Sequence, residues 1–254
     1  MTLGTVSAIG AVLGAIIGSF LATLILRWPE GRSVVGGRSA CDHCGVVLGP
    51  LDLVPLLSLI LRRGRCAQCD GAIDGLHFGV ELGCAIIGGA ALWVAPGVEG
   101  AGYAVLGWGL LTLAVLDWRD FWLPDALTLP LIFLGLTLGM WTTNVVLLDR
   151  VIGAAVGYGA LLAIALGYRA LRGREGLGLG DAKLLAGIGA WFGWQALPFV
   201  LLIASVVALL VVGIGAVRGA RVDRMTKVPL GTFLCIAAVP GWWAMLMLTG
   251  VGAG

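Results

Sequence analysis

Eight apolar stretches, separated by polar loops, occupy most of this chain of 254 residues. Only 12% of the residues are charged and 59% are hydrophobic, whereas an average soluble domain has about 25% charged residues. A water-soluble globule of this composition would have too little polar surface to cover itself. The sequence therefore predicts an all-α polytopic membrane protein.

The number of spanning helices follows from the lengths of these stretches, because a helix that crosses a bilayer needs roughly 20 mostly apolar residues. The sixth stretch is the weakest, since Gly193, Gln195 and Pro198 crowd its end, and it could be a half-span or one arm of a bent hairpin. We expect about eight transmembrane helices, at residues 4–26, 78–96, 101–117, 126–146, 151–168, 182–196, 198–217 and 229–249.

Basic residues are distributed very unevenly between the two sets of loops that these helices define. Of the 16 Lys and Arg residues, 15 fall in one set and only Arg150 falls in the other. Loops enriched in Lys and Arg remain in the cytoplasm. The bias predicts that both termini face outward and that the cytoplasmic loops are 27–77, 118–125, 169–183 and 218–228.

Glycines recur at every fourth position in three of the apolar stretches. This spacing allows helix backbones to approach closely, either within the bundle, which we favour, or between two copies of the chain. The glycines concerned are Gly10, Gly14 and Gly18, Gly135 with Gly139, and Gly153 with Gly157.

The one long loop, 27–77, contains two C-x-x-C pairs separated by 21 residues. Two such pairs present four thiolates in tetrahedral array and resemble a zinc ribbon. Because cytoplasmic thiols stay reduced, we favour zinc over disulfides or a redox role. His43 could replace one thiolate, but a full set of four makes that unnecessary. The predicted zinc ligands are Cys41, Cys44, Cys66 and Cys69.

Between the two cysteine pairs lies an apolar segment, residues 52–61, that is too short to span a bilayer. It could lie along the membrane surface, where Arg62, Arg63 and Arg65 would meet lipid headgroups. It could equally form the core of a small zinc module. The sequence leaves both possibilities open.

Two carboxylates are expected at the same, cytoplasmic edge of the bundle. Asp117 ends the third apolar stretch, and Asp181 follows Gly178-Leu179-Gly180 at the start of the sixth. Ionisable residues at the bilayer edge are functional candidates. Two converging carboxylates indicate an aspartic hydrolase pair, in which one takes a proton from water and the other polarises the carbonyl. The structural alternatives are a helix cap, which suits Asp125 and could suit Asp181, and a solvated side chain, which suits Asp120.

These residues resemble the type IV prepilin peptidases, the GxGD-type membrane aspartic proteases of type IV pili and type II secretion. The resemblance covers nearly the whole chain, in the family's order. The matching segments are Gly18 to Leu21, the four cysteines, Pro55 to Ser58, Arg63 to Cys66, Glu81-Leu82, Asp117 with Leu123 to Leu131, Gly178 to Leu185, and Gly189 to Pro198.

The resemblance implies a bacterial inner-membrane enzyme, with periplasmic termini, that acts at the cytoplasmic face. It would cut the basic leader from type IV prepilins or type II secretion pseudopilins, with Asp117 and Asp181 as the catalytic residues. It would then methylate the new N-terminal residue with S-adenosylmethionine. Membrane lipid is an expected partner and nucleic acid is not.

The resemblance also implies a division of the chain into a first transmembrane helix (1–26), a four-cysteine zinc loop linked to methylation (27–77) and a transmembrane aspartic peptidase core (78–254). Two positions depart from the family pattern in the methylation half, where Asn is usual and this chain has Ala22 and Leu53. No strand–glycine-loop–helix unit is predicted, so the residues that bind S-adenosylmethionine are not assigned. The alternatives are a peptidase without methylation and a proton-coupled transporter.

Overall fold

The computed structural model describes residues 2–34, 36, 39–173, 176–219 and 228–249. Five of the basic residues used in the charge argument lie outside these ranges, namely Arg38, Arg174, Arg221, Arg224 and Lys227.

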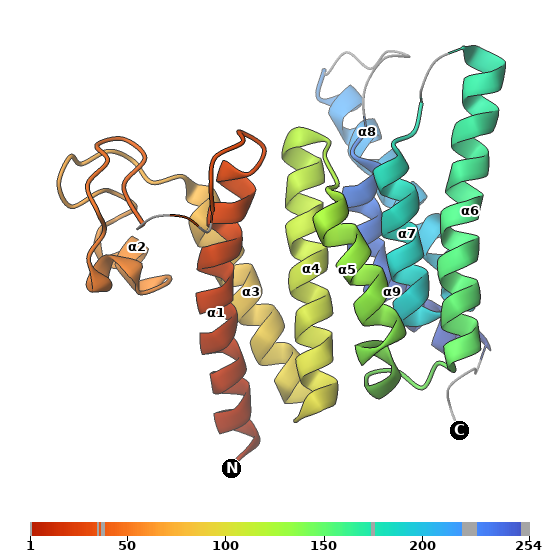
Figure 1. Cartoon of the computed structure of the whole chain (residues 1–254), viewed down its shortest axis with the longest axis horizontal. Coiled ribbons are helices and arrows are strands. Elements are labelled where there is room, and N and C mark those ends of the chain that lie inside the picture. Colours follow the sequence, from red (N-terminus) through yellow and green to blue (C-terminus); the bar gives the residue numbers. More distant parts are fainter. Residues whose placement is uncertain (1, 35, 37–38, 174–175, 220–227, 250–254) are drawn as a thin grey trace. The chain divides into compact units, whose positions relative to one another are not determined.

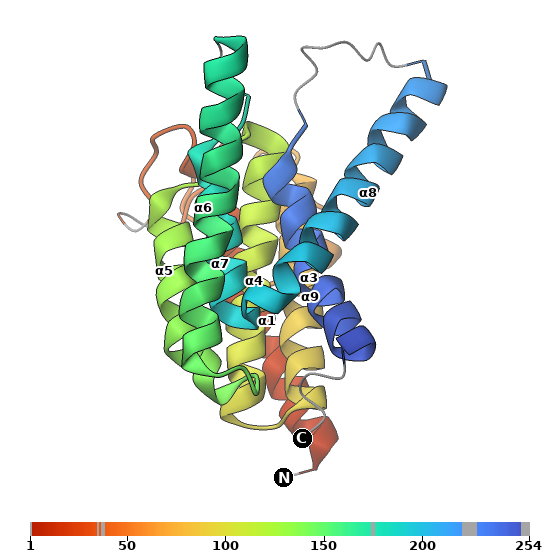
Figure 2. The same cartoon turned by 90° about the vertical axis from the view of Figure 1, so that its right-hand side faces the viewer.

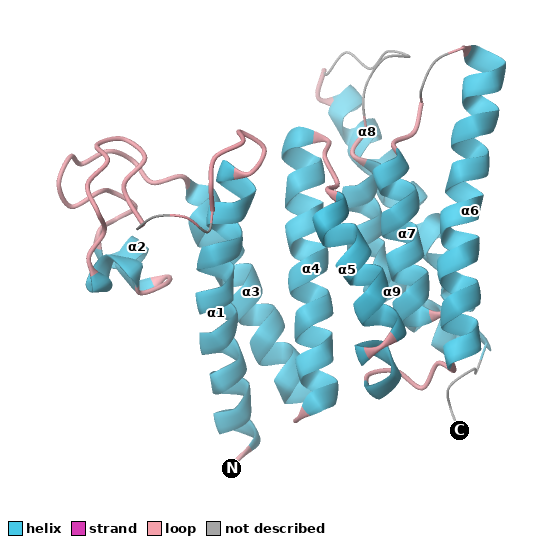
Figure 3. Cartoon of the chain, in the orientation of Figure 1, coloured by secondary structure: helices cyan, strands magenta, loops and turns pink. Residues whose placement is uncertain are grey.

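All eight apolar stretches are helical, and the described ranges contain no β-strand (Figure 3). The helices are α1 (Leu3–Arg27), α3 (Gly75–Val94), α4 (Val98–Asp120), α5 (Asp125–Leu136), α6 (Leu147–Arg172), α7 (Leu179–Phe192), α8 (Leu197–Val217) and α9 (Leu230–Thr249). Short helical segments are α2 (Leu57–Leu61) and the 3-10 turns η1 (Pro50–Leu53), η2 (Leu138–Trp141) and η3 (Trp194–Ala196). The predicted all-α membrane fold is confirmed.

Six helical segments in the described part of the chain are long and apolar enough to cross a membrane. The other two expected spans are shorter, because α5 has 12 residues and α7 has 14. The fourth apolar stretch gives way to η2 after Leu136 instead of continuing to residue 146. The sixth ends early, as its composition indicated, because Gly193 adopts a positive φ of 79° that stops the helix.

The chain forms two compact units, Met1–Thr112 and Leu113–Gly254. The first contains α1, the cysteine loop, α3 and most of α4, and the second contains the remaining helices. The predicted boundary at residue 78 is a functional division and stays a prediction.

Close contact between α1 and α3 holds the first unit together. A Cβ added at Gly10, Gly14 or Gly18 would lie within 3.0 Å of the backbone of α3, at Gly88, Cys84 and Glu81 respectively. The repeated glycines of α1 therefore serve packing within the bundle, as we favoured.

In the second unit, α7 lies between α5 and α6 (Figure 1). Its side chains from Leu184 to Phe192 are all buried. Glycines again set the distances, because a Cβ at Gly153 would lie 2.4 Å from the Gly189 carbonyl and one at Gly135 would lie 2.8 Å from Ala190 Cβ. Helix α8 crosses α9 where Gly241 meets Val200, and the two diverge towards the end of α8 (Figure 2).

We expect Gly14→Ala to lower the free energy of unfolding by about 1–3 kcal/mol, because the new methyl group would lie 2.1 Å from the Cys84 carbonyl oxygen. Gly79→Ala on α3 is the matched control. No atom lies within 4 Å of its added Cβ, so it should leave stability unchanged or raise it by up to about 1 kcal/mol. Thermal unfolding of the detergent-solubilised protein measures both. Equal stability of the two variants would contradict this account of the helix contact.

Candidate functional site

Four helix termini meet at one end of the second unit and bring the predicted carboxylates together. Asp117 lies in the last turn of α4 and is 5% exposed. Asp181 is the third residue of α7 and is half-buried. The two carboxylates lie close enough to interact electrostatically, and the backbone N–H of Gly231 is near both. The structure thus brings together two residues that are 64 positions apart.

The hydrogen bonds distinguish the two carboxylates. Asp117 Oδ2 accepts from the Thr232 backbone N–H at 2.7 Å and from Thr232 Oγ1 at 3.2 Å. Asp181 Oδ1 is buried without a hydrogen-bond partner. Because buried polar atoms are nearly always hydrogen-bonded, this oxygen is the one available to a substrate or to a water molecule.

Gly231 and Thr232, at the start of α9, are site residues that sequence reasoning missed. A Cβ at Gly231 would lie 3.0 Å from Asp117 Oδ2, so only glycine lets the backbone reach the carboxylate. Thr232 Oγ1 also donates to the Ala114 carbonyl at 2.9 Å, which ties α9 to α4. The signal in the sequence was Pro229-Leu230-Gly231-Thr232, a Pro-x-Gly-Thr pattern at the start of an apolar stretch.

Asp125 does not cap α5, contrary to one expectation. The helix begins at Asp125 itself, with Pro124 at the N-cap position and no side-chain cap. The Asp125 carboxylate instead pairs with the Lys183 ammonium at 2.5 Å. Asp181 is likewise inside its helix, since Gly178 occupies the N-cap position. Asp120 is exposed, as expected.

At the opposite end of α5 and α7 lies Arg150, which is fully buried. It is the one basic residue that the charge argument placed outside the cytoplasmic loops, and it lies inside the protein. Its guanidinium and Nε donate to six backbone carbonyls, those of Gly135, Gly139, Thr143, Val145, Ala190 and Trp191. Arg150 therefore satisfies the C-terminal carbonyls of the two short helices, whose N-termini carry Asp125 and Asp181.

In the first unit, the four predicted cysteines converge, with their Sγ atoms all within 4.8 Å of one another. A tetrahedral zinc site with Zn–S bonds of about 2.3 Å requires sulfur–sulfur distances of about 3.8 Å, and Cys41 Sγ and Cys69 Sγ are 3.9 Å apart. His43 stays outside the cluster, with its Nε2 3.0 Å from the Ala72 carbonyl oxygen. The donor set and its spacing fit zinc.

Each cysteine pair lies in a tight turn closed by an isolated antiparallel bridge, Ala40 with Val47 and Arg65 with Ala72. The residue after each second cysteine has a positive φ, 70° at Gly45 and 57° at Asp70. This repeated geometry turns the backbone so that both thiols of a pair point the same way. Such paired turns are typical of zinc ribbons.

Hydrogen bonds and burial shift the pKa values of two of the four thiols in opposite directions. The N–H groups of Cys69 and Gln68 lower the pKa of the Cys66 thiol to about 6. The Gly71 N–H by itself would lower the pKa of the Cys69 thiol. Hydrogen bonding with Cys44, burial and the other two thiols together have a larger effect and raise this pKa to about 12. The clustered thiols thus share protons, which a bound metal ion displaces.

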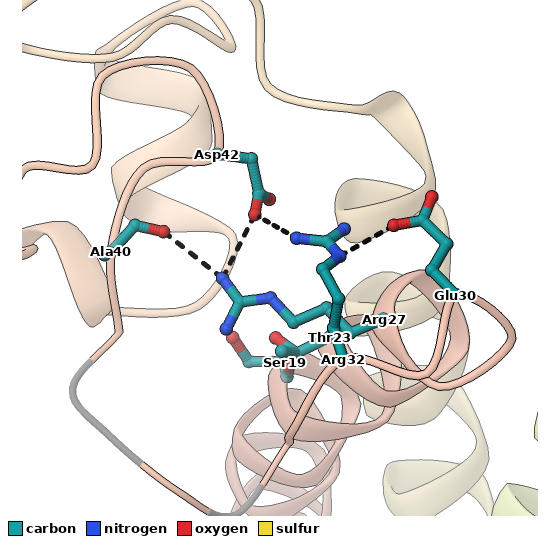
Figure 4. A network of polar contacts seen from close by, with 7 residues as sticks. All are labelled: Ser19, Thr23, Arg27, Glu30, Arg32, Ala40 and Asp42. Carbon is teal, nitrogen blue, oxygen red and sulfur yellow. Dashed lines mark hydrogen bonds and ion pairs between the residues drawn. The ribbon is translucent and has the colours of Figure 1, made fainter.

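A polar network fixes the start of the cysteine loop to the end of α1 (Figure 4). The Asp42 carboxylate accepts from Arg27 at 3.2 Å and from Arg32 at 2.8 Å, and Arg32 also pairs with Glu30 at 2.6 Å. Partial burial alone would raise the pKa of Asp42, but the two guanidinium groups outweigh it and lower the pKa. The ionised Asp42 therefore holds the loop beside α1 at neutral pH.

Comparisons with known proteins agree with this arrangement. Residues 104–213 match the type IV leader peptidase family, and residues 12–95 match the bacterial peptidase A24 N-terminal domain. This chain belongs to the type IV leader peptidase family. No solved structure matches it.

Several prepilin leader peptidase/N-methyltransferases are similar along most of their length. The one from Pseudomonas putida is 36% identical, over 94% of this chain and 89% of the relative. That from Aeromonas hydrophila is 41% identical, over 82% and 71% respectively, and that from Burkholderia pseudomallei is 38% identical, over 89% and 82%. With six membrane-length helices in the described part of its chain, this family member is a multi-pass inner-membrane protein.

We expect Arg150→Met to lower the free energy of unfolding by about 3 kcal/mol or more, because hydrogen bonds from a charged group contribute about 1.5–3 kcal/mol each. Arg150→Lys, which keeps the charge but has fewer donors, should fall between Arg150→Met and the unsubstituted protein. Arg172→Met, at the exposed far end of the same helix, is the control and should change stability little. If Arg150→Met and Arg172→Met had the same free energy of unfolding, the proposal that Arg150 caps the two short helices would be wrong.

Proposed function

We propose that this protein cleaves the basic leader of type IV prepilins or type II secretion pseudopilins and then methylates the new N-terminal residue. The observation that carries the proposal is the meeting of Asp117, Asp181 and the Gly231 N–H at one end of the second unit. Family membership favours this activity over the transporter alternative.

In the proposed mechanism, Asp117 and Asp181 act as the catalytic pair of an aspartic peptidase. A water molecule between the carboxylates loses a proton to one of them and attacks the scissile carbonyl, while the other donates a hydrogen bond to the carbonyl oxygen. Thr232 holds Asp117 by two hydrogen bonds. Asp181 Oδ1, which lacks a partner, is the oxygen positioned to contact the water.

The active site is proposed to open to the cytoplasm, with both termini in the periplasm. Within the second unit, α4 and α6 end with basic residues in their last turns, Arg119, Arg169 and Arg172. The carboxylates lie at this end of α4, and α7 starts beside them with Lys183 in its first two turns. Basic residues at the carboxylate end support cytoplasmic placement by the positive-inside rule.

We further propose that Cys41, Cys44, Cys66 and Cys69 hold a structural zinc ion in a domain required for methylation. The loop has few buried side chains, since neither η1 nor α2 contains a buried residue, so a metal would supply the stability that a core cannot. S-adenosylmethionine would supply the methyl group when bound.

The apolar segment between the cysteine pairs is proposed to contact membrane lipid. Ile60 is 60% exposed and Leu61 is 73% exposed, which supports contact with lipid over a role as the core of a zinc module. Arg62 pairs with Asp52 and Arg65 pairs with Asp70. Arg63 has no acidic partner among the described residues, which leaves its charge for lipid headgroups.

We expect Asp117→Asn and Asp181→Asn each to abolish leader removal while the protein stays folded, because each removes a carboxylate that handles the proton of water. Asp120→Asn, exposed at the end of the same helix as Asp117, is the control and should retain near-native cleavage. Asp125→Asn loses a partly exposed ion pair, worth about 0–1 kcal/mol, and should also cleave. Mass measurement of a co-expressed prepilin reports cleavage. Near-native processing by either the Asp117 or the Asp181 variant would refute the catalytic pair.

We expect Cys44→Ser to release zinc and to reduce methylation severely, while cleavage survives if the loop does not hold the leader. Cys84→Ala is the control, because Cys84 is buried in α3 outside the cluster and should leave the zinc content unchanged. Metal analysis, together with the mass of the processed N-terminus, measures zinc, cleavage and methylation. A fully methylated product from a zinc-free variant would show that the metal site is not needed for methylation.

A further inference from the structure

Glu81 is a buried carboxylate that none of the sites above uses. It lies on α3, is 3% exposed, and accepts one hydrogen bond at Oε2 from the Leu56 backbone N–H at 2.7 Å. No Lys or Arg of the described residues lies within salt-bridge distance of it. A buried charge without a counter-charge is costly, and an ionisable residue in a membrane-spanning helix marks a functional site by default.

The acidic side chains of the preceding segment, residues 28–74, already have partners. Asp42 pairs with Arg27 and Arg32, and Glu30 pairs with Arg32. Asp52 and Asp70 pair with Arg62 and Arg65, and Asp74 caps α3 through the Leu76 N–H. Glu81 therefore differs from these carboxylates in being both the most buried and without a cation. It has the chemistry of a binding site for a cationic ligand.

The backbone over Glu81 is strained. Leu56 has φ 60° and ψ −49°, and the Leu57 N–H donates to the Pro55 carbonyl at 2.6 Å, which closes a three-residue turn. A turn of this kind with positive φ is rare for a residue other than glycine, and such strain concentrates at functional sites. The turn aims the Leu56 N–H at Oε2, and a carboxylate can accept further hydrogen bonds at its other oxygen.

His77 lies one helical turn before Glu81, on the same face of α3, and is half-buried. The charged groups that act on its imidazole are Glu81, Asp74, Asp42 and Arg27. Three of these four are carboxylates. A neutral imidazole has one ring nitrogen free to accept a proton, so His77 can take a proton from a bound ammonium group.

We propose that Glu81 and His77 form the amine site for methylation, in which Glu81 binds the α-ammonium group of the processed substrate and His77 accepts its proton. The inference rests on the proposed function. The ammonium loses one proton to the His77 imidazole, and the nitrogen lone pair then attacks the methyl carbon of the sulfonium donor. The carbon–sulfur bond breaks with its electron pair going to sulfur, so the products are a methylated ammonium and a neutral thioether.

The test distinguishes the negative charge of Glu81 from its hydrogen bond with the Leu56 N–H. Glu81→Gln keeps an oxygen that can accept from the Leu56 N–H but loses the negative charge. The full-length protein in detergent is titrated with a synthetic apolar peptide carrying a free N-terminal amine, and with the same peptide N-acetylated. We expect the unsubstituted protein to bind the free amine at least tenfold more tightly. Glu81→Gln should lose this preference and its methylation, and should retain zinc and leader cleavage.

His77→Gln should bind the free-amine peptide like the unsubstituted protein but methylate it at least tenfold more slowly at saturation. Glu81→Asp, which restores the charge, should recover part of the preference for the free amine. Glu99→Gln is the matched control, because it removes an exposed carboxylate of α4 that does not act on Glu81 or His77. It should bind and methylate like the unsubstituted protein.

If Glu81→Gln kept both the preference for the free amine and methylation, the carboxylate would serve only to hold Leu56 and the inference would be wrong. If it kept the preference but lost affinity for S-adenosylmethionine, the site would bind the sulfonium donor instead, which also overturns the assignment. If the unsubstituted protein cleaved but never methylated, the proposed methylation would fail. The peptide titration would then still decide whether Glu81 binds an amine.

Discussion

Backbone carbonyls at the ends of two short helices impose the constraint on which the second unit depends. With 12 and 14 residues, α5 and α7 are about 18 and 21 Å long, less than the roughly 30 Å of a bilayer core. Their C-terminal carbonyls would be left without partners in an apolar interior, where each costs several kcal/mol. Arg150 donates to carbonyls at both ends. One side chain thereby permits two helices to stop early.

The positions at which α5 and α7 end also determine where their N-termini lie. Because α5 and α7 are anchored by Arg150 and packed through glycine contacts, their N-termini are held beside the end of α4 and the start of α9. Asp117, Asp181 and the Gly231 N–H meet there. Backbone groups that approach a carboxylate in a dry site act strongly on it, since the low dielectric strengthens every electrostatic interaction. The geometry of the carboxylates is therefore set by helix length and glycine packing as much as by the aspartates themselves.

The first unit is stabilised by different interactions. Its loop outside the helices exposes most of its apolar side chains and buries almost none, so hydrophobic burial cannot hold it. Four converging thiols, two matched turns and the ion pairs of Asp42 do so instead. The strained turn at Leu56 is then fixed over Glu81. The loop and the helix beneath it form one polar site within an otherwise apolar unit.

Much of this was determined by the sequence alone. The eight apolar stretches, the four-cysteine cluster and the meeting of Asp117 with Asp181 followed from composition, spacing and charge bias, because these are local patterns repeated at fixed intervals. The early end of α7 was also indicated, but the short length of α5, the pairing of Lys183 with Asp125 and the contacts of Thr232 with Asp117 were not. Nor was the burial of Arg150 or the isolation of Glu81. Each of these features depends on contacts between a buried group and residues from distant parts of the sequence. Only tertiary packing decides which residues make those contacts.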